Sequence, residues 1–194
     1  MMLRPLLLAA TLAAGSLLTA CTTAPTAPLA AADRLDPATL QNWSAEGKLG
    51  LKFKDKGGSL YFTWAETEAG FTLDLSGPLG QGQTRLAGKP GLVTLDNSST
   101  GHVEAETPEA VMQQTMGWQA PVSHLRYWLR GLPATTQAAL QRSASGELTQ
   151  IREDGWQADI ERYSDAGHYH LPSKLVITGP DTRIIVVVSD WQAR

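Results

Sequence analysis

The only cysteine of this 194-residue chain, Cys21, stands where a lipid could be attached. It ends the run Leu18-Thr19-Ala20-Cys21 and follows an apolar stretch, residues 6–18, that begins soon after Arg4. The stretch is too short to span a bilayer and ends in the small residues that a signal peptidase needs. The pattern predicts a lipobox, in which the thiol receives a diacylglycerol and the chain is cut before Cys21. A free thiol in an ordinary secretory signal is the alternative.

This interpretation divides the chain into three parts. Residues 1–20 are the expected signal peptide, 21–35 a lipidated, flexible tether rich in Ala, Pro and Thr, and 36–194 one domain. Thr22 follows the cysteine, in place of the aspartate that retains lipoproteins in the inner membrane of Gram-negative bacteria. We therefore expect an outer-membrane protein, anchored through Cys21, with its domain facing the periplasm.

Other residues that could do chemistry form weak patterns. His168 and His170 could ligate a metal together with Asp165, but a clear third or fourth strong ligand is missing, so solvent-facing histidines are favoured. Gly80-Gln81-Gly82 lacks the third glycine of a dinucleotide-binding loop, and no serine lies in a Gly-x-Ser-x-Gly elbow. We expect no enzyme, no cofactor and no metal.

Composition excludes further classes of protein. The net charge of −3 and the lack of a Lys/Arg cluster argue against nucleic acid as a partner. No second apolar run reaches membrane-spanning length. Because the one cysteine is expected to carry lipid, the core must stabilise the domain without disulfides.

The domain begins with a predicted helix and then alternates with period two. Asp36-Pro37 predicts a helix start that continues through Leu40 and Trp43. Apolar and polar residues then alternate in three runs, which predict an antiparallel meander with one apolar and one solvated face. The runs are 48–54, 59–64 and 71–76, and shorter or later strands are predicted at 84–87, 92–96, 148–152, 156–163, 171–178 and 183–191.

Two short helices are predicted between these strands. Thr107-Pro108-Glu109 supplies the start of the first, and Gly117 its end. Ser123 is the predicted cap of the second, whose apolar residues follow a helical period as far as Leu132. The helices cover an unusually aromatic sheet face, which either packs shut as an ordinary core or encloses a hollow under a helical lid. The pattern alone favours the closed core.

The turn Gly77-Pro78-Leu79-Gly80 places a leucine at its tip. In one interpretation Leu79 folds back under the sheet as a turn residue. In the other, the loop protrudes and Leu79 dips into a membrane.

Several blocks of the sequence, taken in order, resemble the LolB family of outer-membrane lipoprotein receptors. The blocks span essentially all of the domain: Gly47-Lys48-Leu49, residues 71–80, Met116-Gly117-Trp118, residues 125–133, residues 171–175 and Asp190-Trp191. Residues 137–147 match less well.

The resemblance implies a mainly β fold, namely an eleven-stranded, half-open antiparallel barrel with a lid of short helices over an apolar cavity. It implies a monomer that accepts triacylated lipoproteins from the periplasmic carrier LolA and inserts them into the outer-membrane phospholipid, without nucleotide hydrolysis. The Gly77–Gly80 loop would then be the membrane-inserting loop. The residues expected to line the cavity are Leu49, Leu51, Phe62, Trp64, Phe71, Leu73, Trp118, Leu125, Trp128 and Leu129. The alternative is a lipid-anchored module that binds a lipid or glycolipid on a similar sheet.

Overall fold

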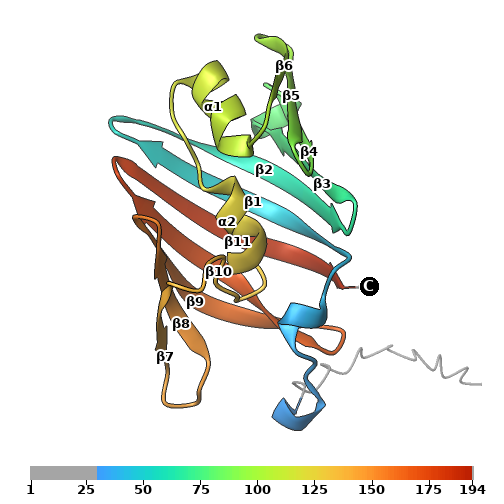
Figure 1. Ribbon diagram of the computed structural model, residues 1–194, viewed down its shortest axis with the longest axis vertical. Helices are drawn as coiled ribbons and strands as arrows, with labels where there is room; N and C mark the ends of the chain where they lie inside the picture. The colour runs from blue at the N-terminus through green and yellow to red at the C-terminus, as the bar shows by residue number, and fades with distance from the viewer. Residues whose placement is uncertain (1–29, 194) are drawn as a thin grey trace, which may run out of the picture.

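The computed structural model describes residues 30–193 and is drawn in Figure 1. The predictions for the signal peptide, for Cys21 and for the first part of the tether lie outside these residues. Among the residues that the structure describes, no helix has the length and apolar character needed to cross a bilayer.

One antiparallel sheet makes up most of the described chain. Its strand order is β6-β5-β4-β3-β2-β1-β11-β10-β9-β8-β7, and the two edge strands, β6 and β7, do not pair with each other. The predicted half-open antiparallel barrel is thus confirmed, and its curl is visible in Figure 1. The strands are β1 (Trp43–Phe53), β2 (Lys56–Thr67), β3 (Gly70–Ser76), β4 (Thr84–Lys89), β5 (Leu92–Asn97), β6 (Gly101–Ala105), β7 (Ala139–Arg142), β8 (Leu148–Glu153), β9 (Trp156–Ala166), β10 (Tyr169–Gly179) and β11 (Thr182–Ala193).

The first strand starts earlier than the sequence predicts. The helix expected through Leu40 and Trp43 is wrong: only a 3-10 turn, η2 (Pro37–Thr39), forms there, and β1 already begins at Trp43. Asp36 caps the turn by accepting a hydrogen bond from Ala38 N at 2.9 Å. Trp43 occupies a position of β1 whose side chain points to the interior. Burying its indole there stabilises the chain more than extending a short helix would.

Two helices, α1 (Pro108–Met116) and α2 (Val122–Trp128), cross the inner face of the sheet (Figure 1). Thr107 caps α1 as predicted, and Gly117 ends it in the left-handed conformation, with φ 72°. The prediction for α2 was wrong at both ends. Its N-cap position is Pro121, and it ends at Trp128 rather than near Leu132.

Ser123 is not a cap because it makes a different contact. Its backbone N and its Oγ donate to the two carboxylate oxygens of Glu109, at 2.8 and 2.9 Å. Glu109 lies in the first turn of α1, so this contact joins the two helices. We call α1 and α2 together the lid.

The two ends of the barrel differ in how tightly the inner face is packed. At one end, called here the Lys54 end, the β1–β2, β8–β9 and β10–β11 hairpins turn. At the other, called the Trp43 end, β1 begins and β11 finishes. Trp43 and Ala45 are buried, whereas the inward residues Leu49, Leu51 and Phe53 are only half-buried. Along β1 the packing therefore loosens toward the Lys54 end, whereas Ile177 of β10 and Ile184 of β11 stay buried near that end.

Candidate functional site

The ten residues predicted to line a cavity lie on the inner face of the sheet or on the lid side that covers it. All of them belong to one apolar cluster or pack against it. The half-buried members are Leu49, Leu51, Phe71 and Trp118. The almost fully buried members are Phe62, Trp64, Leu73, Leu125, Trp128 and Leu129.

Aromatic rings close the Trp43 end of this interior. The Trp43 ring lies 5.8 Å from Trp64 and 5.3 Å from Trp191, measured between centroids, and Trp64 lies 5.7 Å from Phe71. These tilted pairs each add about 0.5–1.5 kcal/mol to the burial of their apolar area. This end of the barrel is therefore its rigid base.

The Lys54 end has the open apolar surface. The Trp118 ring, just after α1, stacks on Phe53 at 5.9 Å between centroids. Beside them Met116 is 37% exposed, a large fraction for an apolar side chain that faces the sheet. Together with Leu51 these side chains line a hollow of about 480 Å³, whose rim carries Lys54 and other residues of the β1–β2 hairpin. The hollow is of a size that binds small apolar ligands.

Lid helix α2 is fastened to the sheet by a buried carboxylate on β2. Glu66 is 4% exposed, forms an ion pair with Arg126 of α2 and accepts a hydrogen bond from Trp64 Nε1 at 3.1 Å. Burial raises the pKa of Glu66, and Arg126 only partly offsets this effect. Keeping Glu66 ionised in the folded protein therefore costs free energy. The ion pair with Arg126 of the lid reduces that cost.

A second buried carboxylate holds the end of α2. Glu153 of β8 accepts from Trp128 Nε1 at 2.6 Å and from the backbone N of Ala134 and Thr135 at 2.9 and 2.7 Å. Burial alone would raise the pKa of Glu153, but these hydrogen bonds together lower it. Glu153 thus fixes both the Trp128 ring and the chain that leaves the lid.

Two more polar contacts fasten the lid. Arg130 Nη1 donates to the carbonyl oxygen of Leu40 at 2.8 Å, and burial lowers the pKa of its guanidinium. His124 Nε2 lies 2.8 Å from Asp154 Oδ2, on the β8–β9 hairpin. The lid is therefore held by an apolar face and by polar contacts spaced around it.

Glu66 and Glu153 are not among the predicted site residues, although the sequence carries a signal for both. Each carboxylate has the inward parity of its strand: Glu66 follows Phe62 and Trp64 at intervals of two, and Glu153 follows Ile151 in the same way. A charge at a buried parity needs a partner, because an unpaired buried charge costs several kcal/mol. The identity of that partner depends on the tertiary fold.

Replacing the buried carboxylate tests the electrostatics of the lid. We expect Glu66→Gln to lower stability by about 1–3 kcal/mol at pH 7, since the amide has one acceptor oxygen and leaves either Trp64 Nε1 or Arg126 without its acceptor. The raised pKa means that the Glu66 carboxyl binds its proton more tightly in the folded protein than in the unfolded chain. Wild-type stability should therefore fall as pH rises above 4.5, and the variant should lose this slope.

Urea denaturation at pH 4.5, 6 and 7 measures both quantities. Glu68→Gln, at an exposed position near the end of the same hairpin, is the matched control and should leave the slope unchanged. A Glu66→Gln protein with the wild-type slope would show that this carboxylate does not titrate as described.

The loop between β3 and β4 presents Leu79 to solvent. The side chain is 96% exposed, so it does not fold back under the sheet, and its backbone has a φ of 62°, in the left-handed region. Hydrogen bonds from Gly77 N to Gln81 O, at 2.7 Å, and from Gly80 N to Gly77 O, at 3.1 Å, close the neck of the loop. A leucine held in this conformation costs about 1 kcal/mol or more, and such strain is commonly stored at functional sites.

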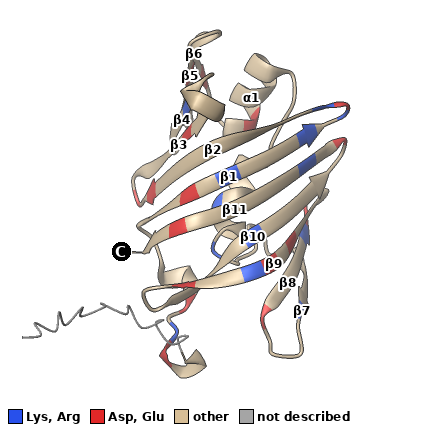
Figure 2. Ribbon diagram, turned by 180° about the vertical axis from the view of Figure 1, so that it is seen from behind, with Lys and Arg blue, Asp and Glu red and all other residues tan. Residues whose placement is uncertain are grey.

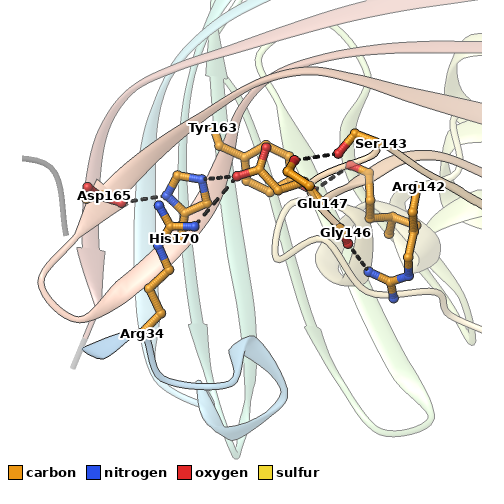
Figure 3. A network of polar contacts seen from close by, with 10 residues as sticks. Arg34, Arg142, Ser143, Gly146, Glu147, Tyr163, Asp165 and His170 are labelled. Atoms are coloured by element: carbon orange, nitrogen blue, oxygen red, sulfur yellow. Dashed lines mark hydrogen bonds and ion pairs between the residues drawn. The ribbon is translucent and has the colours of Figure 1, made fainter. Parts of the chain in front are cut away.

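His168 and His170 lie at the Trp43 end, and the His170 side chain belongs to the polar network drawn in Figure 3. His170 Nδ1 lies 2.5 Å from Asp165 Oδ1, and its Nε2 lies 3.1 Å from Glu147 Oε1. Its ring stacks on Tyr163, whose pKa is raised to about 12 by burial and by the nearby Glu147 charge. Within residues 30–193, no group of three or more His, Cys, Asp and Glu side chains is placed to hold a metal ion.

This network holds the chain that precedes the domain. Arg34 Nη1 lies 3.6 Å from Glu147 Oε1, and Leu35 N donates to the carbonyl oxygen of His168 at 2.8 Å. Both residues belong to the segment predicted as a tether, 21–35. The described part of that segment therefore lies against the β9–β10 hairpin, and it meets the domain at the Trp43 end.

The largest of the hollows described, about 800 Å³, lies over strands β2 to β6 and differs from the interior in chemistry. Charged and polar side chains line it, and they already pair with one another. Arg85 Nε donates to Asp74 Oδ1 at 2.6 Å, and His102 Nδ1 lies 2.6 Å from Asp96 Oδ1. The apolar interior and its opening at the Lys54 end are the better candidate site.

Comparison with known proteins supports the resemblance seen in the sequence. The family described as "Outer membrane lipoprotein LolB" matches residues 41–191, which is most of the chain. Among solved structures, a LolA superfamily protein from Nitrosomonas europaea is distantly similar, with a TM-score of 0.49 and 6% identity over 83% of this chain and 88% of that one.

Curated relatives match over most of their length. An "Outer-membrane lipoprotein LolB" of Stutzerimonas stutzeri is 40% identical over 81% of this chain and 77% of the relative. Those of Pseudomonas paraeruginosa and Pseudomonas aeruginosa are 40% and 38% identical, each over 80% of this chain and 76% of the relative. These descriptions name a lipoprotein of the outer membrane and no catalytic activity. The chain belongs to the LolB family of outer-membrane lipoproteins.

Proposed function

We propose that this protein accepts triacylated lipoproteins from the periplasmic carrier LolA and inserts them into the outer membrane as a monomer. The observation that supports this most directly is the apolar inner face, which is covered by two short helices rather than by a second sheet. Acyl chains need no directional contacts, so Leu, Trp and Phe side chains suffice to shield them.

The lid must move for such cargo to enter. In the structure, Leu125 and Trp128 of the lid, with Leu129 just after it, fill the space above the sheet. An acyl chain that enters replaces these side chains as the covering of the inner face, so little apolar area becomes exposed to water. Shielding one acyl methylene from water is favourable by about 0.8 kcal/mol. Because a triacylated protein carries many methylenes, it does not cross the aqueous periplasm unaided.

Directional transfer then needs no nucleotide. A receiver that binds the acyl chains about 1.4 kcal/mol more tightly than its donor takes the cargo in a ratio of about ten to one. A bilayer binds acyl chains more tightly still, because two or three chains anchor a protein almost permanently. The half-buried side chains at the Lys54 end provide the opening through which the chains pass.

The test is transfer of a labelled lipoprotein from loaded LolA. The full chain, purified in mild detergent, is mixed with LolA that carries a fluorescent triacylated lipoprotein, and the two proteins are then separated. We expect most of the label to move onto this chain. If the label stays on LolA, and lipid extracts of this chain contain free phospholipid or glycolipid, the protein is a lipid-binding module.

A further inference from the structure

Two of the three hairpins at the Lys54 end together carry more positive than negative charge beside the apolar opening, whereas the third, β8–β9, carries Glu153 and Asp154 beside Arg152. The β1–β2 and β10–β11 hairpins meet there, joined by a hydrogen bond of 2.9 Å from Lys54 N to Asp181 O. In the ribbon of Figure 2, blue segments lie near these hairpins with red at their tips, and red bands lie toward the opposite end of β1 and β11. The charged residues of the two hairpins and their adjoining strand ends are Lys52, Lys54, Lys56 and Arg183, against Asp55 and Asp181.

The lysines adjoin apolar surface rather than acidic partners. Lys54 and Lys56 line the rim of the same hollow as Leu51, Met116 and Trp118. The Nζ of Lys54 lies over the Phe53 ring, 5.3 Å from its centroid, and no ion pair is found for either rim lysine within residues 30–193. Asp55 lies between the two lysines on the same rim, so the rim carries a net charge of +1. A net positive rim around an apolar hollow matches the two parts of an anionic phospholipid, its phosphate and its acyl chain.

The exposed leucine lies on the same side of the molecule. The segment that carries Leu79, η3 (Pro78–Gly80), contacts β2. It follows Ser76, which pairs with Tyr61 of β2, and from there β2 runs back to its first residue, Lys56, at the Lys54 end. The loop therefore lies on the Lys54 side of the sheet, beside β2 at a point five residues along the strand from Lys56.

We propose that Lys54 and Lys56 bind the phosphates of anionic phospholipids and seat the opening of the barrel on the inner surface of the outer membrane. This inference rests on the proposed function, for which it supplies the orientation that release of cargo requires. Near an anionic surface each lysine contributes about a fivefold change in an association constant, and salt screens the effect over about 10 Å at 0.1 M.

The experiment reports the docked orientation of the lipidated full chain in vesicles. Gly58, exposed and with open space around it, is replaced by Cys and labelled with an environment-sensitive dye. Vesicles of phosphatidylcholine alone are compared with vesicles containing 30% phosphatidylglycerol. We expect higher emission with phosphatidylglycerol and loss of the increase at 0.5 M NaCl.

Charge reversal identifies the lysines. The double variant Lys54→Glu/Lys56→Glu is expected to shift the docking equilibrium by about thirtyfold or more, and Lys54→Gln/Lys56→Gln by less. Lys89→Glu, an exposed lysine at the Trp43 end, is the matched control and should behave as wild type. Equal emission from the two vesicle types, or wild-type emission from the double variant, would overturn the proposal.

Cargo transfer from LolA separates this proposal from the proposed function. Because Lys54 and Lys56 rim the cargo opening, acceptance by the double variant is measured beside its docking, and the docking signal alone tests the phospholipid site. If the double variant loses acceptance but keeps the lipid-dependent emission, the lysines serve an acidic protein partner and the phospholipid site is wrong. A wild-type chain that docks but accepts no cargo would support the phospholipid site and overturn the transfer function.

Discussion

Leu79→Glu should slow insertion of cargo into membranes at least about tenfold and leave acceptance from LolA unchanged. The side chain is 96% exposed and touches little of the barrel, so the fold does not depend on it. Transfer of the leucine side chain from water into a bilayer is favourable by about 1.5–3 kcal/mol. A glutamate lacks this transfer free energy and adds a charge that is costly to bury in lipid. Liposomes that receive labelled lipoprotein from the loaded chain measure the rate.

Two further variants make this result specific to the loop. Leu140→Glu changes another exposed leucine, on edge strand β7, and should insert cargo at the wild-type rate. Leu79→Phe keeps an apolar tip and should insert cargo nearly as fast as wild type. If Leu79→Glu inserts cargo normally, or if Leu140→Glu is equally slow, the loop has no special role at the membrane.

Most of the sheet could be predicted because its alternation is long and regular. From β1 to β3 each inward position is apolar or small, apart from Glu66 and the first residue of β2, Lys56, so the period of two fixes the buried face of each strand. The start of β1 was missed because Asp36-Pro37 is a strong local helix signal, and local signals do not report the packing of Trp43 against two other tryptophans.

The lid was harder to predict than the sheet. Its residues were recognised from helical spacing, but the start of α2 depends on Glu109, which competes for the hydroxyl and the N–H of Ser123. The carboxylates that hold the lid, Glu66 and Glu153, lie 60 and 25 residues from the side chains they contact in α2. Pairing over such distances follows from the register of the strands, which alternation alone does not give.

Glu153→Ala should lower stability by about 4 kcal/mol at pH 7, a decrease of about 10 °C in Tm. The change leaves Trp128 Nε1 and the backbone N of Ala134 and Thr135 without their acceptor, and each unsatisfied buried donor costs about 1–3 kcal/mol. Thermal unfolding followed by circular dichroism measures the loss. Glu161→Ala removes a more exposed ion pair with Lys174 and should cost less than about 1 kcal/mol.

The pH dependence of this loss has a definite sign, opposite to that expected for Glu66. The folded-state pKa of Glu153 lies below its usual value, so the carboxylate stabilises the fold above about pH 4.5 and this contribution disappears as pH falls through the folded pKa. The difference in the free energy of unfolding between wild type and Glu153→Ala should therefore be largest near neutral pH and become smaller in acid. A stability difference that widens in acid would show that the hydrogen bonds to Glu153 do not favour its charged form.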